Sequence, residues 1–65
     1  MTTLHVMTTL PNDPVILLSY VNTQLRDFYP SLAELCAALD ASEESIRRTL
    51  ASIDYEYDPE TNQFI

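Results

Sequence analysis

Two adjacent arginines, Arg47 and Arg48, are the residues of this sequence best suited to contact a ligand. They lie in the segment SEESIRRTL, which is predicted to form a helix that begins at Ser42 and exposes both guanidinium groups. In a recognition helix, such arginines hydrogen-bond to guanine edges or to phosphates. Glu43 and Glu44 precede them by four residues, the favoured spacing for helical ion pairs worth about 0.2–0.5 kcal/mol each. Two interpretations follow: nucleic-acid contact through Ser42, Glu43, Arg47 and Arg48, or ion pairing within the helix.

The overall charge favours the second interpretation. The 65 residues include no lysine, three arginines and ten acidic residues, and the formal net charge is −7. A DNA-binding domain normally carries a basic face, because neutralising phosphates supplies most of its affinity. The C-terminal segment instead carries four carboxylates that would repel a phosphate backbone: Asp54, Glu56, Asp58 and Glu60. We therefore expect a small adaptor or regulatory module that binds protein, with a DNA-binding transcriptional regulator as the alternative.

No group of residues in the sequence indicates catalysis or a bound cofactor. Cys36 and His5 are the only cysteine and the only histidine, which excludes an internal disulfide and a standard structural zinc site. Cys36 also lies in the apolar stripe of a predicted helix, where cysteine behaves as a small buried hydrophobe. The C-terminal carboxylates match no calcium loop, which requires a glycine that this chain lacks. We expect no enzyme activity, no cofactor and no metal.

The apolar pattern and the turn residues predict three helices followed by a hairpin. In chain order these elements are expected at residues 13–27, 31–39, 42–53 and 55–65. Each helix is expected to begin at a residue whose side-chain oxygen can accept a hydrogen bond from the first turn: Asp13, Ser31 and Ser42. Ser31 and Glu34 form the capping-box pattern S-x-x-E. The order of elements predicts a three-helix, winged-helix-like (helix-turn-helix) α+β domain.

The first helix has one broad apolar face on a helical wheel. Its members are Val15, Leu17, Leu18, Val21, Leu25 and Phe28. Ile16 and Tyr20 lie one turn apart outside that face. With the aromatic residues of the hairpin, they form a predicted surface for a protein partner or for a second copy in a homodimer: Ile16, Tyr20, Tyr55, Tyr57 and Phe64.

Because the chain has no glycine, asparagine or aspartate must occupy any left-handed backbone position. The predicted junctions between elements assign this role to Asn12, Asp40 and Asn62. In the hairpin, Asp58 before a proline favours a type I turn, and a left-handed Asn62 completes a three-residue loop with a bulge. Glycine adopts positive φ without steric cost, so Asn62→Gly is expected to stabilise the fold slightly.

Two parts of the predicted domain, the hairpin and the second and third helices, resemble known sequences locally. The segment YDPETNQF resembles the designed mini-hairpin chignolin, which implies that Tyr57 and Phe64 form a cross-strand aromatic pair. The segments SLAELCAAL and SEESIRRTL resemble the two motif helices of DeoR-type bacterial regulators, which implies a recognition helix at residues 42–50. Asp40 stands where that pattern usually has glycine, and the acidic hairpin departs from it most.

A wider resemblance covers residues 10–65. The opening motif Leu10-Pro11-Asn12-Asp13-Pro14, the stretch LLSYVNTQLRD and the ending YEYDPETNQF are similar to a family of small uncharacterised bacterial proteins, a domain of unknown function. The resemblance implies a bacterial, cytoplasmic protein and brings no activity with it.

The chain is short enough to form one domain. We assign that domain to residues 10–65 and expect residues 1–9 to be an N-terminal arm, either disordered or an edge strand. The longest apolar stretch, Val15 to Leu18, is far below the roughly 20 residues that a membrane span needs. One unpaired cysteine is typical of a reducing compartment, so a cytoplasmic location is expected.

Overall fold

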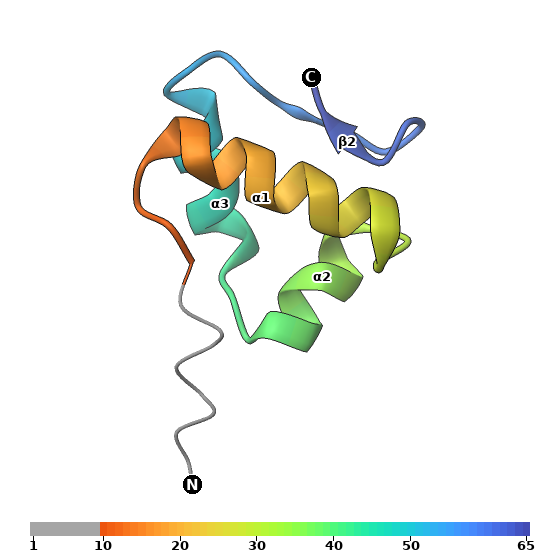
Figure 1. Cartoon of the computed structure of the whole chain (residues 1–65). Helices are drawn as coiled ribbons and strands as arrows, with labels where there is room; N and C mark the ends of the chain where they lie inside the picture. The colour runs from red at the N-terminus through yellow and green to blue at the C-terminus, as the bar shows by residue number, and fades with distance from the viewer. Residues whose placement is uncertain (1–9) are drawn as a thin grey trace, which may run out of the picture.

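The computed structural model describes residues 10–65, so the expected arm at residues 1–9, with His5, lies outside the described residues. The elements are α1 (Pro14–Asp27), α2 (Leu32–Leu39), α3 (Glu43–Ala51), β1 (Tyr57–Asp58) and β2 (Gln63–Phe64). Helix α1 crosses the middle of the molecule, with the hairpin along one side and α2 on the other (Figure 1). It contacts α3, β2 and α2. The predicted α+β class, three helices followed by an antiparallel hairpin, is confirmed.

All three helices begin where the sequence predicts. The Asp13 carboxylate accepts hydrogen bonds from the backbone N–H groups of Val15 (2.8 Å) and Ile16 (3.3 Å). The Ser31 and Ser42 hydroxyls each accept one, at 3.1 Å, from the residue three positions later. These bonds satisfy N–H groups that have no partner inside the helix.

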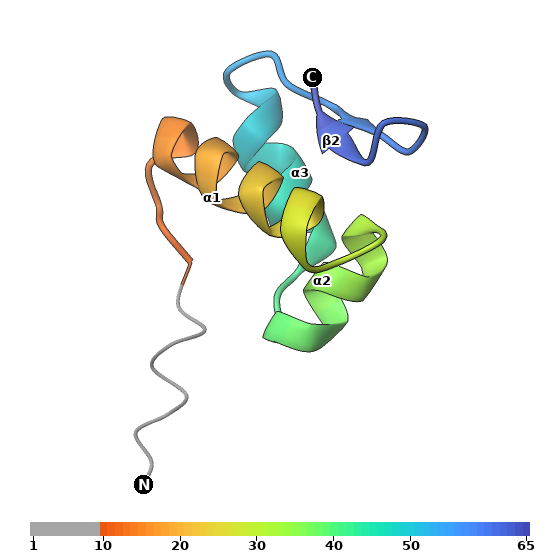
Figure 2. The ribbon, with the colours of Figure 1, turned by 45° about the vertical axis from the view of Figure 1, so that its right-hand side comes forward.

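Left-handed residues end two of the helices. Asp40 has φ 54° and lets the backbone N–H of Ala41 reach the Cys36 carbonyl at 2.9 Å, which closes α2 before the turn into α3 (Figure 2). Helix α3 ends at Ala51, before the expected residue 53, because the N–H groups of Ile53 and Asp54 bond three residues back, to Leu50 (3.1 Å) and Ala51 (2.9 Å). Asp54, with φ 68°, closes this last turn and lets the N–H of Tyr55 reach the Leu50 carbonyl at 3.0 Å.

The prediction that Asn12 is left-handed is wrong, whereas those for Asp40 and Asn62 are confirmed. The chain enters α1 through Asp13, whose backbone is extended at φ −72°, so the junction needs no positive φ. Asp54 takes the third left-handed position instead.

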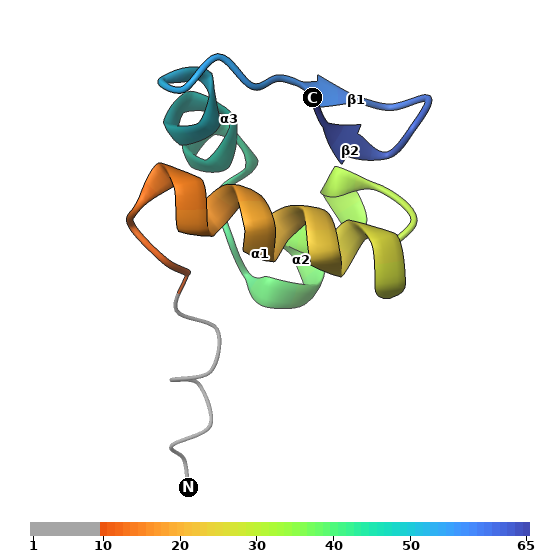
Figure 3. The ribbon, with the colours of Figure 1, turned by 45° about the horizontal axis from the view of Figure 1, so that its top comes forward.

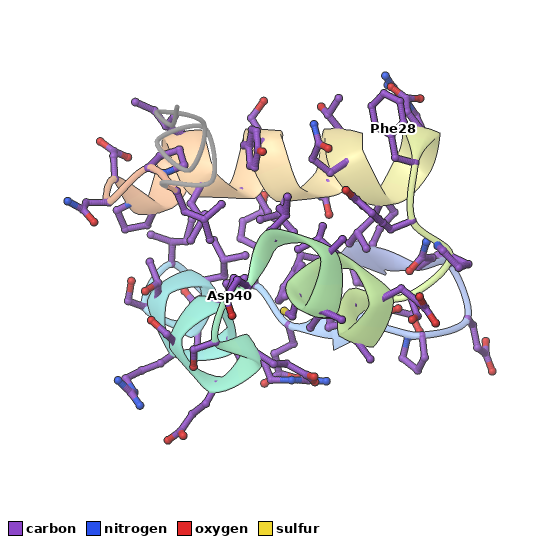
Figure 4. All side chains as sticks on the ribbon, turned by 90° about the horizontal axis from the view of Figure 1, so that it is seen from below. Phe28 and Asp40 are labelled. Carbon is purple, nitrogen blue, oxygen red and sulfur yellow. The ribbon has the colours of Figure 1, made fainter. Side chains whose placement is uncertain are left out.

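The core lies where the three helices meet the hairpin. Its buried side chains are Leu17, Val21, Leu25, Leu32, Leu35, Cys36, Ile46, Leu50 and Phe64. Two residues predicted on the buried face of α1 are exposed: Val15 by 64% and Phe28 by 68%. Val15 lies at the edge of that face in the first turn. Phe28 is the C-cap, with φ −129°, so its side chain leaves the helical wheel and projects from the end of α1 (Figure 4).

The hairpin has the predicted aromatic pair and a different loop. The strands β1 and β2 lie side by side (Figure 3). Tyr57 faces Phe64 across them, with ring centroids 5.5 Å apart, and Asp58 pairs with Gln63. Four residues, 59–62, connect the strands in place of the predicted three. The Asp58 carboxylate accepts hydrogen bonds from the Glu60 N–H (3.1 Å) and the Thr61 hydroxyl (3.0 Å), which stabilises the wider loop.

No helix within residues 10–65 is long and apolar enough to cross a membrane.

Candidate functional site

The exposed face of α3 carries both arginines in ion pairs. Arg47 donates to the Glu43 carboxylate through Nε at 3.0 Å and Nη2 at 2.8 Å. Arg48 donates through Nη2 to Glu44 at 2.9 Å. The fourth residue of the predicted nucleic-acid set, Ser42, caps the helix with its hydroxyl. The predicted ion pairs within the helix are present, so both guanidinium groups are engaged by carboxylates of the same helix.

Tyr57 connects α3 to the hairpin and to the other helices. The Arg47 guanidinium lies over its ring, 5.5 Å from the centroid, at a distance typical of cation–π contact. The Tyr57 hydroxyl accepts a hydrogen bond from the Leu32 N–H (3.2 Å) and donates one to Asn62 Oδ1 (2.6 Å). The same hydroxyl therefore caps the start of α2 and orients the loop of the hairpin.

Asn62 extends this network to the end of α1. Its Nδ2 group donates to the carbonyls of Tyr29 (2.9 Å) and Leu25 (3.1 Å), which have no partner within the helix. The side chain thus joins the hairpin loop to the α1 C-terminus while its backbone holds φ 57°. This bonding overturns the reason for expecting Asn62→Gly to stabilise the fold, because that expectation considered only the backbone.

Asn22 binds β2 to α1. Its Oδ1 accepts the Phe64 N–H at 2.8 Å, and its Nδ2 donates to the Phe64 carbonyl at 3.0 Å. An amide side chain therefore pairs with one edge of the hairpin as a neighbouring strand would. Gln63 adds a third bond, from its Nε2 to the Asn22 carbonyl at 3.0 Å.

A pocket of about 240 Å³ lies between α3 and the hairpin. Its lining residues are Arg47, Ala51, Tyr55, Glu56, Tyr57 and Phe64. We call this hollow the α3–hairpin groove. It contains aromatic and aliphatic surface beside Glu56 and the guanidinium of Arg47, which is already paired with Glu43. Such a surface suits a peptide side chain better than a small polar substrate, because it offers apolar area with few free polar groups.

The structure brings together only part of the predicted protein-contact surface. Tyr55 and Tyr57 line the α3–hairpin groove, and Tyr55 is 36% exposed. Phe64 is 1% exposed, so it is a core residue that supports the groove and is not itself a contact surface. Ile16 is 58% exposed on α1 but does not line the groove, and Tyr20 packs against the core.

The charged side chains of the domain leave a surplus of negative charge. Each of the three arginines is paired, the third being Arg26, which bonds to Asp27 at 2.9 Å. The remaining carboxylates in residues 10–65 have no ion-pair partner there: Asp13, Glu34, Asp40, Asp54, Glu56, Asp58 and Glu60. Four of these seven belong to the hairpin and the segment leading into it.

Cys36 is buried in the core, as predicted, with 7% of its surface exposed. Burial raises the pKa of its thiol, the negative charge of Glu43 raises that pKa further, and Arg47 opposes both effects. The thiolate is therefore disfavoured at neutral pH. Among residues 10–65, no group of His, Cys, Asp and Glu side chains is arranged to hold a metal ion.

Sequence reasoning missed Asn22, Asn62 and the hydroxyl of Tyr57 as the residues that build the site. Apart from the bond between Tyr57 and Asn62, their partners are 25 to 42 positions away, so no local spacing reveals them. The one available signal was Asn22 itself, a polar residue at the edge of the apolar face of α1.

These features define a small α+β domain in which a C-terminal hairpin docks on a three-helix body. Residues 11–64 match the family described as Domain of unknown function (DUF4250), and the chain belongs to that family. The predicted membership of a small uncharacterised domain family is confirmed. No curated protein and no solved structure matches the chain.

Proposed function

We propose that this domain is a non-enzymatic, winged-helix-like module that binds protein in the cytoplasm. The order of elements supports this assignment, since three helices precede a hairpin and a tight turn at Asp40 joins α2 to α3. Winged-helix domains bind either DNA or protein, so the fold alone does not decide between these ligands. The charge of the surface is therefore the property that distinguishes DNA from protein as the ligand.

The charge distribution is the observation that most supports protein binding. Every arginine of the domain is paired with a carboxylate, whereas the hairpin and its leading segment bear four carboxylates without an ion-pair partner. A phosphate backbone approaching this face meets uncompensated negative charge. A protein partner with a basic surface is attracted by the same field. The partner is either another protein or, through the exposed Ile16, a second copy of the chain.

DNA binding is the second candidate, favoured by one observation. Arg47 and Arg48 are exposed on α3, the helix that a helix-turn-helix domain inserts into the major groove. Base contact would require both arginines to leave Glu43 and Glu44. Exposed helical ion pairs contribute only about 0.2–0.5 kcal/mol each, so the greater obstacle is the acidic hairpin.

Selection from a displayed library of random peptides tests the proposal. We expect the immobilised full chain to enrich peptides rich in lysine and arginine, with individually measured Kd values in the micromolar range that weaken as salt increases. The salt dependence distinguishes this electrostatic binding from nonspecific hydrophobic binding, which does not weaken as salt increases. If no peptide binds better than about 1 mM while random duplex DNA binds at micromolar concentration, the ranking of the two candidates is reversed.

A further inference from the structure

The hairpin has one open edge. Glu56 and Ile65 exchange two backbone hydrogen bonds, of 3.0 and 2.9 Å. In an antiparallel ladder, pairs that exchange two backbone hydrogen bonds alternate with pairs that exchange none. Tyr57 and Phe64 form the next pair, so the N–H and C=O groups of each point away from the other strand, towards opposite edges of the hairpin. Those of Phe64 are taken by the Asn22 amide. Within residues 10–65, nothing hydrogen-bonds to those of Tyr57.

The open edge adjoins the α3–hairpin groove. Tyr57 and Glu56 belong to both, and α3 contributes Ala51 and Arg47 to the opposite wall. An added strand would place the side chain opposite Tyr57 on the same sheet face as the Tyr57 ring, since facing residues of neighbouring strands share a face. That side chain would enter the groove. Its apolar lining and its volume of about 240 Å³ suit one aliphatic side chain.

The flanking positions carry charge. Glu56 immediately precedes β1 and Asp58 follows Tyr57 within it, so the alternation of an extended chain directs both side chains to the face opposite the Tyr57 ring. Neither has an ion-pair partner among the described residues. The residues of an added strand that face these two carboxylates are therefore favoured to be lysine or arginine.

We infer that the open edge of β1 and the α3–hairpin groove bind an extended peptide with an aliphatic residue between two basic ones. This inference rests on the proposed protein-binding function. The Tyr57 backbone exchanges two hydrogen bonds with the aliphatic residue, whose side chain fills the groove. This is recognition by strand addition, in which backbone bonds supply affinity and alternate side chains supply specificity. A second copy of this chain fits the edge poorly, because antiparallel pairing at Tyr57 would bring Glu56 of each copy against Asp58 of the other.

The test uses the full chain and a capped peptide that carries valine between two lysines, flanked by threonines. Amide hydrogen exchange measured by NMR is expected to slow at least tenfold at Tyr57 on saturation, and to stay unchanged at Phe64, whose N–H is already bound. N-methylation of the valine, which removes the donor for the Tyr57 carbonyl, is expected to weaken binding at least tenfold. Replacing both lysines with glutamate is expected to abolish binding.

Two variants with matched controls locate the peptide. Ala51→Tyr fills the groove and is expected to weaken binding at least tenfold, whereas Ala37→Tyr, on an exposed position of α2 outside the groove, leaves it unchanged. Glu56→Gln is expected to weaken binding about threefold, as loss of one cross-strand ion pair implies. Glu34→Gln makes the same change in net charge outside the groove and is expected to have less effect.

The outcomes separate this inference from the function on which it rests. If library-selected peptides bind while Tyr57 exchange and the Ala51→Tyr variant show no effect, strand addition is wrong and protein binding stands. If Tyr57 exchange slows with rising protein concentration in the absence of peptide, a second copy occupies the edge and the inference is overturned. If no peptide binds, both proposals fail.

Discussion

At the residue scale, three non-glycine residues hold left-handed backbone conformations in a chain without glycine. Asp40, Asp54 and Asn62 have φ values of 54°, 68° and 57°. The carboxylates of Asp40 and Asp54 are exposed and make no hydrogen bond within the described residues, so these side chains serve the turn alone. Asn62 differs, because its amide bonds to Tyr57, Leu25 and Tyr29.

Glycine substitutions at two of these positions are therefore expected to have opposite effects. Asn62→Gly removes an amide that serves three partly buried groups and should lower the free energy of unfolding by about 1–3 kcal/mol. Asp54→Gly removes only the steric cost of positive φ and should raise it by a few tenths of a kcal/mol. Urea unfolding monitored by circular dichroism measures both. Stabilisation by both substitutions would show that the Asn62 network contributes nothing.

Cys36 provides a test of the core through its reactivity. Burial and the charge of Glu43 raise the thiol pKa in the folded state above its ordinary value of 9.0, so the reactive thiolate is scarce at neutral pH. Labelling by a disulfide reagent at pH 7 is expected to be at least tenfold slower for the native chain than for the same chain in denaturant. Equal rates would mean that the contact of Cys36 with Leu32 and Leu35 does not exclude solvent.

At the element scale, the hairpin is held on α1 chiefly by Asn22 and Gln63. A two-stranded hairpin is marginal in water by itself, so its docking contributes to its formation. The buried ring of Phe64 supplies the apolar part of this contact, and the Asn22 amide satisfies the Phe64 backbone groups that would otherwise lack a partner.

Asn22→Ala is expected to leave the N–H and C=O groups of Phe64 unpaired at a partly buried position. The free energy of unfolding should fall by about 1–3 kcal/mol, and the Phe64 amide should exchange faster with solvent. Thr23→Ala, on an exposed neighbouring position of α1, is the matched control and should change stability by less than about 0.5 kcal/mol. Equal effects of the two substitutions would contradict the docking role of Asn22.

The starts of the elements were predictable from the sequence, and some of their ends were not. Asp13, Ser31 and Ser42 cap helices through bonds that span two or three residues, so local sequence suffices. The end of α3 was misplaced because residues 52–54 continue the chain in a tighter turn with three-residue hydrogen bonds, which the apolar pattern does not distinguish from the helix. The loop of the hairpin was predicted one residue too short because the Asp58 side chain stabilises a wider turn.

At the scale of the whole molecule, the site depends on contacts that no local pattern encodes. The cross-strand pair of Tyr57 and Phe64 was predictable, since it needs only the register of one hairpin. The groove was not, because it forms where α3 meets the hairpin and depends on Ala51 and Arg47 as well. The exposure of Val15 and Phe28 was also missed, because an ideal helical wheel ignores where the partner elements end.

Charge is the property of the whole molecule from which the proposed function follows. All three arginines are engaged by carboxylates within four residues in the chain, which leaves seven carboxylates without ion-pair partners in residues 10–65. A net charge of −7 gives the chain a field that repels nucleic acid and attracts basic protein surfaces.

A titration of fluorescent random duplex DNA with the full chain at about 150 mM salt tests this claim most directly, because charges are screened there only beyond ~8 Å. We expect no binding at tens of micromolar protein for the wild type, and none for Arg26→Ala, a control that removes one arginine outside α3. Micromolar or tighter binding by the wild type and by Arg26→Ala that is lost in the Arg47→Ala, Arg48→Ala double variant would contradict the account. It would establish α3 as a DNA-recognition helix.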